Sequence, residues 1–358
     1  MTTEMINRME GLILGQAVGD ALGLPLEGLS PARSRKIFGN GPLRHRFILG
    51  RGQISDDTEH LCMTGQALLA YPRDPENFVR SLAWKLRWWL AGLPAGTGLA
   101  TLRSILKLWL GFGPFRSGVF SAGNGPAMRS PVIGAYHHDD IHRMREYVRA
   151  STRLTHTDPK AEQGALAVAL CAAGAVRMDN TSLDRIEILT SLRQELEDPE
   201  LLGMLDILED HLNTESSTED LAHALGFKKG VSGYIYQTVP VVIFAFLRHT
   251  GDYRQTVESV ISLGGDTDST GAIAGALAGA AAGADGIPRD WVDGIMEWPR
   301  SVAWMRKLAQ NLAASTGKEI METRPGPVPL FWPGILPRNL LFMVIVLVHG
   351  FRRLFPPY

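Results

Sequence analysis

The sequence of 358 residues predicts an all-α protein. Apolar residues recur at helical spacing along most of the chain, whereas the strict alternation that is typical of strands is scarce. Alanine, leucine, glycine and arginine dominate these periodic stretches. No internal repeat of fixed period emerges, which argues against a solenoid. The length is compatible with one large domain.

The periodic stretches place the helices in chain order. We predict helices near residues 4–22, 57–71, 76–91, 98–110, 125–136, 139–152, 159–177, 182–195, 198–212, 218–224, 231–249, 253–262, 269–283 and 300–314.

Two of these helices carry glycine at every fourth position. The first set is Gly11, Gly15, Gly19 and Gly23, and the second is Gly271, Gly275, Gly279 and Gly283. Each interior glycine costs up to about 1 kcal/mol relative to alanine, so this spacing needs a structural reason. Acidic residues beside both runs, and apolar lengths below the ~20 residues of a span, disfavour a membrane dimer. We interpret the sets as two central helices in close contact.

The composition changes at Thr323. Residues 324–337 contain five prolines and predict an extended arm, and the apolar run Leu340–Val348 predicts a short helix. We therefore expect a domain over residues 1–322 and a separate C-terminal segment over 323–358. Nine residues are too short for a transmembrane span. Packing of this run onto the body or a partner subunit is favoured over contact of residues 340–353 with a membrane surface.

Hydrophobic residues make up 45% of the chain and charged residues 20%, which is typical of a soluble globular protein. The net charge of −1 provides no bulk attraction for nucleic acid, so no nucleic-acid partner is expected. The N-terminus lacks the cationic start and apolar stretch of an export signal. Cys62 and Cys171 lie in apolar helical sequence, as buried thiols in a reducing compartment do. We expect a cytoplasmic protein.

Two acidic clusters, Ser55–Glu59 and Gly264–Ser269, each stand at a predicted helix start. Asp and Ser favour such positions as N-caps, and either cluster alone allows that interpretation. Together they provide a set of oxygen donors without cysteine, which suits a hard cation such as Mg²⁺ or Mn²⁺. One cluster on each of two packed helices predicts a two-metal site. An isoprenoid synthase is disfavoured, because His60 stands where the third acid of a DDxxD motif belongs.

Five segments in order resemble the ADP-ribosylglycohydrolase family. They are GLILGQAVGDALGLPLEG (11–28), SDDTEH (55–60), SAGNGPAMR (121–129), LTHTDPKA (154–161) and GGDTDSTGAIAGALAG (264–279). The resemblance extends over about residues 5–315. It implies a compact orthogonal multi-helix bundle and a hydrolase that cleaves the anomeric bond of ADP-ribose, reversing ADP-ribosylation.

The resemblance also implies a pair of Mg²⁺ ions and assigns their ligands. These are Ser55, Asp56, Asp57, Asp266, Asp268 and Ser269. Serine replaces the threonine of relatives at Ser55 and Ser269, which keeps the hydroxyl with a freer side chain. Glu27 and Asp57 are the expected catalytic carboxylates. Glu27 corresponds to a glutamate that would position or deprotonate the attacking water, and a solvent-exposed loop glutamate is the alternative.

Further residues are expected to bind the substrate by the same resemblance. They are Ser121, Gly123, Asn124, Gly125, His156, Tyr234, Gly264 and Gly265. Glycines at 123 and 125 allow the backbone to approach a diphosphate closely, and a helix N-terminus adds a favourable dipole. His156 is expected near the ribose and Tyr234 stacked on the ligand. Buried structural roles remain the alternatives for both.

One departure from the family bears on specificity. Arginine-directed members carry an Asp-Ile-Gly motif where this chain reads LPAGTGLATL (93–102), without any acid. This segment is more similar to the serine-directed branch. We expect an O-linked protein adduct, such as ADP-ribosylserine, or an ADP-ribose-bearing small molecule. A non-catalytic ADP-ribose binder, or a structural protein such as the crystallins of this family, is the alternative. Retention of an oxygen donor at every ligand position favours the enzyme.

Overall fold

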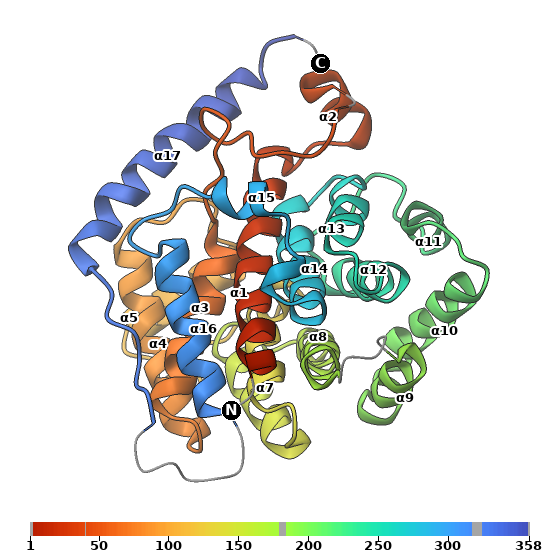
Figure 1. The fold of residues 1–358 in the computed structure, drawn as a ribbon. Helices are drawn as coiled ribbons and strands as arrows, with labels where there is room; N and C mark the ends of the chain where they lie inside the picture. Colours follow the sequence, from red (N-terminus) through yellow and green to blue (C-terminus); the bar gives the residue numbers. More distant parts are fainter. Residues whose placement is uncertain (1–2, 40, 179–183, 317–323, 357–358) are drawn as a thin grey trace.

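A computed structural model describes residues 3–39, 41–178, 184–316 and 324–356 (Figure 1). These residues fold into helices with only isolated β-bridges between loops, which confirms the predicted all-α class. In chain order the elements are α1 (Thr3–Gly23), η1 (Leu24–Leu26), α2 (Pro31–Phe38), α3 (Asp56–Ala70), α4 (Pro75–Ala91), α5 (Leu99–Trp109), α6 (Gly125–Tyr136), α7 (Ile141–Thr155), α8 (Pro159–Arg177), α9 (Arg185–Glu195), α10 (Pro199–Asn213), α11 (Thr218–Ala224), α12 (Ile235–Arg248), α13 (Tyr253–Ile261), α14 (Thr267–Ala282), η2 (Ala284–Gly286), α15 (Arg289–Asp293), α16 (Val302–Ser315), η3 (Trp332–Gly334) and α17 (Ile335–Arg352).

Every helix predicted from periodicity is present within a few residues, and two short ones were not predicted. α2 has no fully buried residue, so it lacks the apolar face on which the prediction rests. Its start signal is nevertheless in the sequence, because Ser30 caps the helix and Pro31 occupies its first position. α15 has five residues, which is too few for periodicity to reveal.

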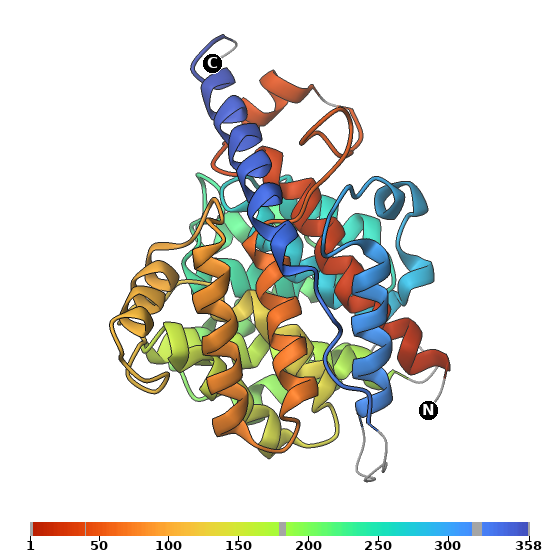
Figure 2. The same cartoon turned by 90° about the vertical axis from the view of Figure 1, so that its left-hand side faces the viewer.

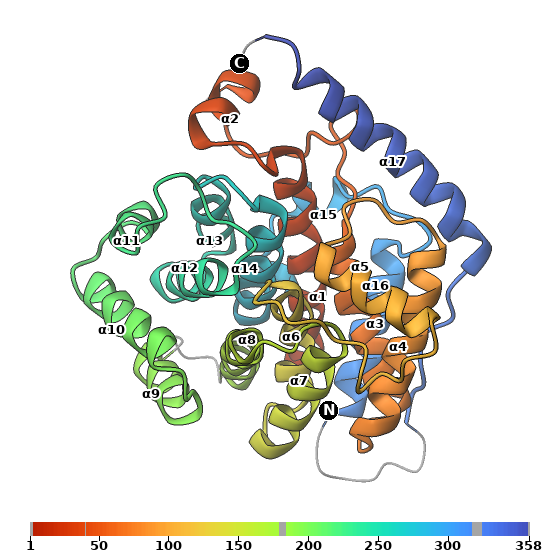
Figure 3. The same ribbon diagram turned by 180° about the vertical axis from the view of Figure 1, so that it is seen from behind.

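α1 and α14 lie side by side at the centre of the molecule, surrounded by the other helices (Figures 1 and 3). Their glycines face one another in antiparallel order. A Cβ added to Gly15 would stand 2.2 Å from the carbonyl oxygen of Gly275, and one added to Gly19 would stand 1.9 Å from that of Gly271. The expected contact between the two glycine sets is thereby confirmed. At the two ends of the contact the pattern changes: Gly23 meets the Thr267 carbonyl, and Gly283, which ends α14 with a positive φ, lies between Gly11 and the Asn7 side chain.

The C-terminal helix is longer than expected. Pro337 falls in the first turn of α17, where its missing N–H costs no hydrogen bond, so the helix begins at Ile335 rather than after the prolines. The helical segment Trp332–Arg352 is long and apolar enough to cross a membrane, by length and composition alone. The expectation that this segment is too short for a transmembrane span is therefore wrong. The boundary proposed at residues 322 and 323 falls outside the described residues.

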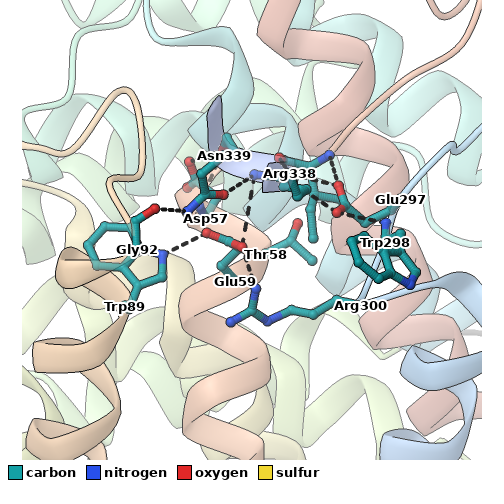
Figure 4. A network of polar contacts seen from close by, with 12 residues as sticks. Asp57, Thr58, Glu59, Trp89, Gly92, Glu297, Trp298, Arg300, Arg338 and Asn339 are labelled. Carbon is teal, nitrogen blue, oxygen red and sulfur yellow. Dashed lines mark hydrogen bonds and ion pairs between the residues drawn. The ribbon is translucent and has the colours of Figure 1, made fainter. Parts of the chain in front are cut away.

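α17 is attached to the body through a buried polar network (Figure 4). The Arg338 guanidinium donates to both oxygens of Glu297, at 2.9 and 2.7 Å, and to the carbonyl of Ile54. Glu59 of α3 accepts from Trp89 and forms an ion pair with Arg300. Because these charges are almost fully buried, each carboxylate depends on its guanidinium partner.

The close approach of α1 and α14 generates the first prediction. Gly15→Ala should lower the free energy of unfolding by about 2 kcal/mol or more, because the added methyl meets backbone that cannot move aside. Gly203→Ala is the matched control: Gly203 lies in α10 with open space around it, so alanine should stabilise the protein by up to about 1 kcal/mol. Denaturant unfolding of both variants measures the difference. If the Gly15→Ala and Gly203→Ala variants had the same free energy of unfolding, the two central helices would be able to move apart without loss of stability.

Candidate active site

Several helix ends meet at one cleft. α3, α5, α6 and α14 begin there, and α1 ends there through η1. Because the N-terminus of a helix carries partial positive charge, four such ends favour bound anions and nearby carboxylates. The glycine contact between α1 and α14 sets this arrangement, since it fixes Gly23 against the Thr267 carbonyl.

The two acidic segments come together as predicted. Ligand oxygens of Glu27, Asp266 and Asp268 all lie within 4.8 Å of one another. Asp56 and Asp57, at the start of α3, line the same cleft. Asp57 accepts hydrogen bonds from the hydroxyls of Ser55 and Ser269, both at 3.2 Å. The other oxygen of Asp57, Oδ1, is buried without a hydrogen-bond partner among the described residues.

The N-capping interpretation holds for one cluster only. The Ser55 hydroxyl accepts from the backbone N–H of Asp57 at 3.3 Å and so caps α3. Asp266 occupies the cap position of α14 without making a side-chain capping bond. Its Oδ2 instead accepts from the Asn124 amide at 2.7 Å. Asn124 therefore positions a carboxylate of the acidic cluster, in addition to its place in the predicted diphosphate loop.

Asp20 is a site residue that the sequence analysis did not assign. It is fully buried in α1, and its carboxylate accepts from the backbone N–H groups of Ser55 and Thr58 and from the Thr58 hydroxyl. These bonds fix the first turn of α3 against α1. The signal in the sequence was an isolated acid in an apolar helix, beside one of the glycines. Burial raises the pKa of Asp20 to about 7, against the lowering effect of its hydrogen bonds.

Burial, and after it repulsion between the acids, opposes ionisation of Asp56, Asp57 and Asp268. Burial, followed by the charges of Asp20, Glu59 and Glu27, raises the pKa of Asp56 well above its usual range. Burial and neighbouring acids do the same for the pKa of Asp57 and Asp268. A concentration of oxygen donors whose charges repel, with an unpartnered Asp57 oxygen among them, fits a divalent cation of the Mg²⁺ type.

The cleft beside the acids has a volume of about 320 Å³, which is adequate for a nucleotide-sized ligand. Five of the residues that are predicted to bind the substrate line it: Ser121, Gly123, Asn124, Gly125 and His156. Cβ atoms added to Gly123 and Gly125 would stand 3.1 and 3.2 Å from the His156 ring, so these glycines keep the loop close to the histidine. The acid-free segment over residues 93–102 forms part of the wall through Gly96, Gly98 and neighbouring residues.

His156 is held as a neutral ring. Its Nδ1 lies 2.8 Å from the Thr155 hydroxyl, and burial together with the nearby charge of Arg129 lowers its pKa to about 3. Arg129 is itself buried and donates to Ser151 and Thr155, which places it behind the histidine. A neutral imidazole at the cleft wall can exchange hydrogen bonds with sugar hydroxyls.

Three predicted substrate-binding residues do not line this cleft. Gly264 and Gly265 have positive φ angles and connect backbone segments: Gly28 donates to the Gly265 carbonyl at 2.7 Å, and Gly265 donates to that of Leu29 at 3.0 Å. They therefore hold the loop after η1 next to the start of α14. The Tyr234 hydroxyl accepts from Lys160 at 3.1 Å, and its backbone pairs with Gly123. A ligand-binding role for these three residues stays a prediction.

His60 lies outside the cleft, fully buried with its ring edge-to-face against Trp89 at 4.5 Å between centroids. It provides no acid at the position that an isoprenoid synthase requires.

Comparison with known proteins identifies the relatives of this fold and site. The chain matches the ADP-ribosylglycohydrolase family over residues 1–320. It is 30% identical over 300 residues to the ADP-ribosyl-(dinitrogen reductase) glycohydrolase of Rhodospirillum rubrum, covering 80% of this chain and 89% of that protein. It is 27% identical over 345 residues to ADP-ribosylhydrolase ARH3 of Xenopus tropicalis, covering 85% and 95%. A solved ADP-ribosylglycohydrolase-related protein complex superposes with a TM-score of 0.66 and 27% identity over 88% of this chain and 99% of that chain.

The electrostatics of the cluster generate the second prediction. A raised pKa of Asp268 in the folded protein means that the unfolded chain ionises first, so the metal-free protein loses stability as the pH rises above about 4. Asp268→Asn carries no charge at any pH and should remove that loss. With chelator present, the variant should melt at a higher temperature than the wild type near pH 8, with little difference near pH 4.

The buried histidines have a lowered pKa, so their contribution to stability rises with pH, opposite to that of Asp268. This contribution is the same in the wild type and in Asp268→Asn, and it cancels when their melting temperatures are compared. The variant should also lose hydrolase activity. A destabilisation of the same size at both pH values would show that the Asp268 carboxylate serves instead to accept from the Ser269 N–H.

Proposed function

Because the chain belongs to the ADP-ribosylglycohydrolase family and is a glycosidic-bond hydrolase, we propose that it releases ADP-ribose from a hydroxyl oxygen with two Mg²⁺ ions at its acidic cluster. The observation that carries this proposal is one cleft in which Glu27, Asp266 and Asp268 face the Gly123–Gly125 loop. Such a cleft can hold a sugar beside the acids and a diphosphate at the loop. The substrate would be an ADP-ribosylated protein or an ADP-ribose-bearing small molecule.

The residues present fit the proposed cations. Asp56, Asp57, Asp266 and Asp268 would hold them, together with the hydroxyls of Ser55 and Ser269. All of these are oxygen donors, and Mn²⁺ would suit the same set. When bound, the cations would orient the ribose diol and favour ionisation of water at neutral pH. Burial first, and repulsion between the acids second, raise the pKa of Asp56, Asp57 and Asp268 in the protein alone, and bound cations would offset both effects by favouring the ionised carboxylates.

Glu27 is the residue that we propose as the general base. It lies at the edge of the acidic cluster, on the loop after η1, and within 4.8 Å of Asp268. Its side chain is exposed, as the alternative interpretation expects, but loss of solvent around the carboxylate and the Asp266 charge raise its pKa, while the Arg353 charge lowers it. A carboxylate with a raised pKa is a better proton acceptor near neutral pH. Glu27 would take a proton from the attacking water while the water oxygen bonds to the anomeric carbon and the bond from that carbon to the leaving oxygen breaks. The leaving oxygen would take a proton from solvent to become the free hydroxyl, and Glu27 would return its proton to solvent.

The remaining residues would bind and orient. Backbone N–H groups of the Gly123–Gly125 loop, at the N-terminus of α6, would contact the diphosphate. The neutral His156 ring would hydrogen-bond the sugar. An oxocarbenium-like transition state carries positive charge, which the nearby carboxylates would stabilise.

The leaving group is proposed from the wall over residues 93–102. An arginine adduct presents a cationic guanidinium, which would gain from a carboxylate beside it. This wall offers glycines, apolar residues and the hydroxyl of Thr101, but no acid. Glu59 cannot substitute, since it is buried and paired with Arg300. A neutral O-linked adduct needs no counter-charge at this position.

The metal requirement is tested by removing divalent cations. We expect hydrolysis to fall to background after exhaustive chelation and to return with Mg²⁺ or Mn²⁺, because the oxygen donors of the cluster repel one another without a cation. Release of ADP-ribose measures activity, and far-ultraviolet circular dichroism checks that the chelated protein stays folded. Full activity of the exhaustively chelated protein would contradict the two-metal site.

The leaving-group preference is tested on matched peptides. ADP-ribosylserine should have a higher kcat/KM than ADP-ribosylarginine in the wild type. Gly98→Asp should shift the ratio towards arginine by about tenfold, because it places a carboxylate in the cleft wall. Gly98→Asn is the matched control: an added side chain has open space, and both residues can cap α5, so only the charge differs. A wild-type preference for the arginine peptide would overturn the O-linked assignment.

A further inference from the structure

α17 has two apolar stripes on opposite sides. The inner stripe, with Ile335, Phe342 and Ile345 buried, packs on the body beside the anchors Arg338 and Asn339. Further along the helix, His349 lies 2.7 Å from the carbonyl oxygen of Phe47 and stacks on its ring. α17 is therefore fixed to the molecule by contacts at both ends and by a continuous apolar seam.

The outer stripe has no covering element. It consists of Leu336, Leu340, Val344, Leu347, Phe351 and Leu354, all exposed. Their spacing of three or four residues places those within α17 along one side of the helix, opposite the buried Ile335, Phe342 and Ile345, and Leu354 follows just after the helix ends. An apolar stripe of this length on a protein surface marks a site of interaction.

The exposed apolar surface continues from the start of α17 onto α4 and α5. The Trp332 ring lies 6.3 Å from that of Trp88, which in turn contacts Trp84 and Trp109 at 5.8 Å, all distances between centroids. All four indoles are substantially exposed. These helices share the face that Figure 2 turns toward the viewer. Tryptophan favours the boundary between hydrocarbon and water.

Basic residues adjoin the other end of the stripe. Arg33 of α2 donates to the Arg353 carbonyl at 2.6 Å, which places α2 beside the end of α17 (Figure 1). Arg35 and Arg352 are exposed in this region. The sequence contains no acid over residues 28–55 or 325–358, so the positive charge in these segments is uncompensated within them.

We propose that the α17 face binds the surface of a bilayer that contains anionic phospholipids. The outer stripe would enter the headgroup–acyl boundary with α17 parallel to the membrane, the tryptophans would lie at the same depth, and the arginines would contact the lipid phosphates. Apolar burial and basic residues together provide the two contributions that stable membrane attachment requires.

The alternatives fit the structure less well. Insertion of α17 across the bilayer would remove Arg338 from Glu297 and leave a buried carboxylate unpaired. A protein partner would need a polar rim of mixed character, because protein interfaces carry about one hydrogen bond per 100–200 Å². This stripe is bordered by tryptophans at one end and by cations at the other.

Vesicle flotation with the full chain tests the proposal. We expect the protein to float with phosphatidylcholine vesicles that contain phosphatidylserine, and to stay at the bottom of the gradient with phosphatidylcholine alone. High salt should weaken the association, because it screens the arginines. Alkaline carbonate should release the protein, whereas retention after that wash would show insertion across the bilayer and overturn the surface assignment.

Variants separate the two contributions. The double variant Leu347→Glu, Phe351→Glu should weaken vesicle binding by about a hundredfold, since it removes two apolar groups and adds negative charge. Ile186→Glu is the matched control, because Ile186 is 75% exposed on α9, on the far side of the molecule. The double variant Arg35→Gln, Arg352→Gln should bind the vesicles about tenfold more weakly, and its binding should no longer depend on phosphatidylserine. Hydrolysis in vesicle-free buffer should be unchanged in all three, which verifies that they are folded.

Two further results would overturn the proposal. One is equal flotation of the wild type and the double glutamate variant. The other is failure of the wild type to float, together with a dimer in sedimentation that the same variant dissociates, which would identify a second copy of the chain as the occupant of the stripe.

Discussion

The close approach of α1 and α14 is the constraint on which the site depends. Glycine backbones face one another along both helices, so the distance between the helix axes is set by main-chain atoms rather than by side chains. Because that contact runs from Gly11 to Gly23, it fixes the position of the end of α1 relative to the start of α14. The acids on the two segments are then brought within reach of one cation by rigid elements rather than by a flexible loop.

Holding these acids rigidly together lowers the stability of the folded protein, because several carboxylates are buried close to one another. Asp20 is buried in order to hold the first turn of α3, and Asp57 leaves an oxygen without a partner. The N-termini of α3 and α14 offset part of the repulsion through their dipoles. Functional sites commonly oppose stability in this way, and the surrounding glycine contact and apolar core compensate for it.

The sequence revealed the helices, the glycine contact and the two acidic segments, because each is encoded in local spacing. The remaining features depend on distant residues. Asp20 acts on Ser55 and Thr58, and Glu59 pairs with Arg300, which no local pattern indicates. The prolines before α17 favoured an extended arm, but Pro337 falls in a first turn, where proline is tolerated. Gly264 and Gly265 matched a family motif, but their backbone hydrogen bonds to neighbouring loops are visible only in the three-dimensional structure.

The pairing of α1 with α14 also determines the order in which this chain can fold during synthesis. Thr267 donates to the Gly23 carbonyl across 244 residues of sequence. α1 therefore remains without this partner, with its glycine face uncovered, until α14 has been synthesised. Contacts between such distant segments slow folding and prolong the exposure of apolar surface. A chain truncated before α14 would lack the helix against which the glycines of α1 pack.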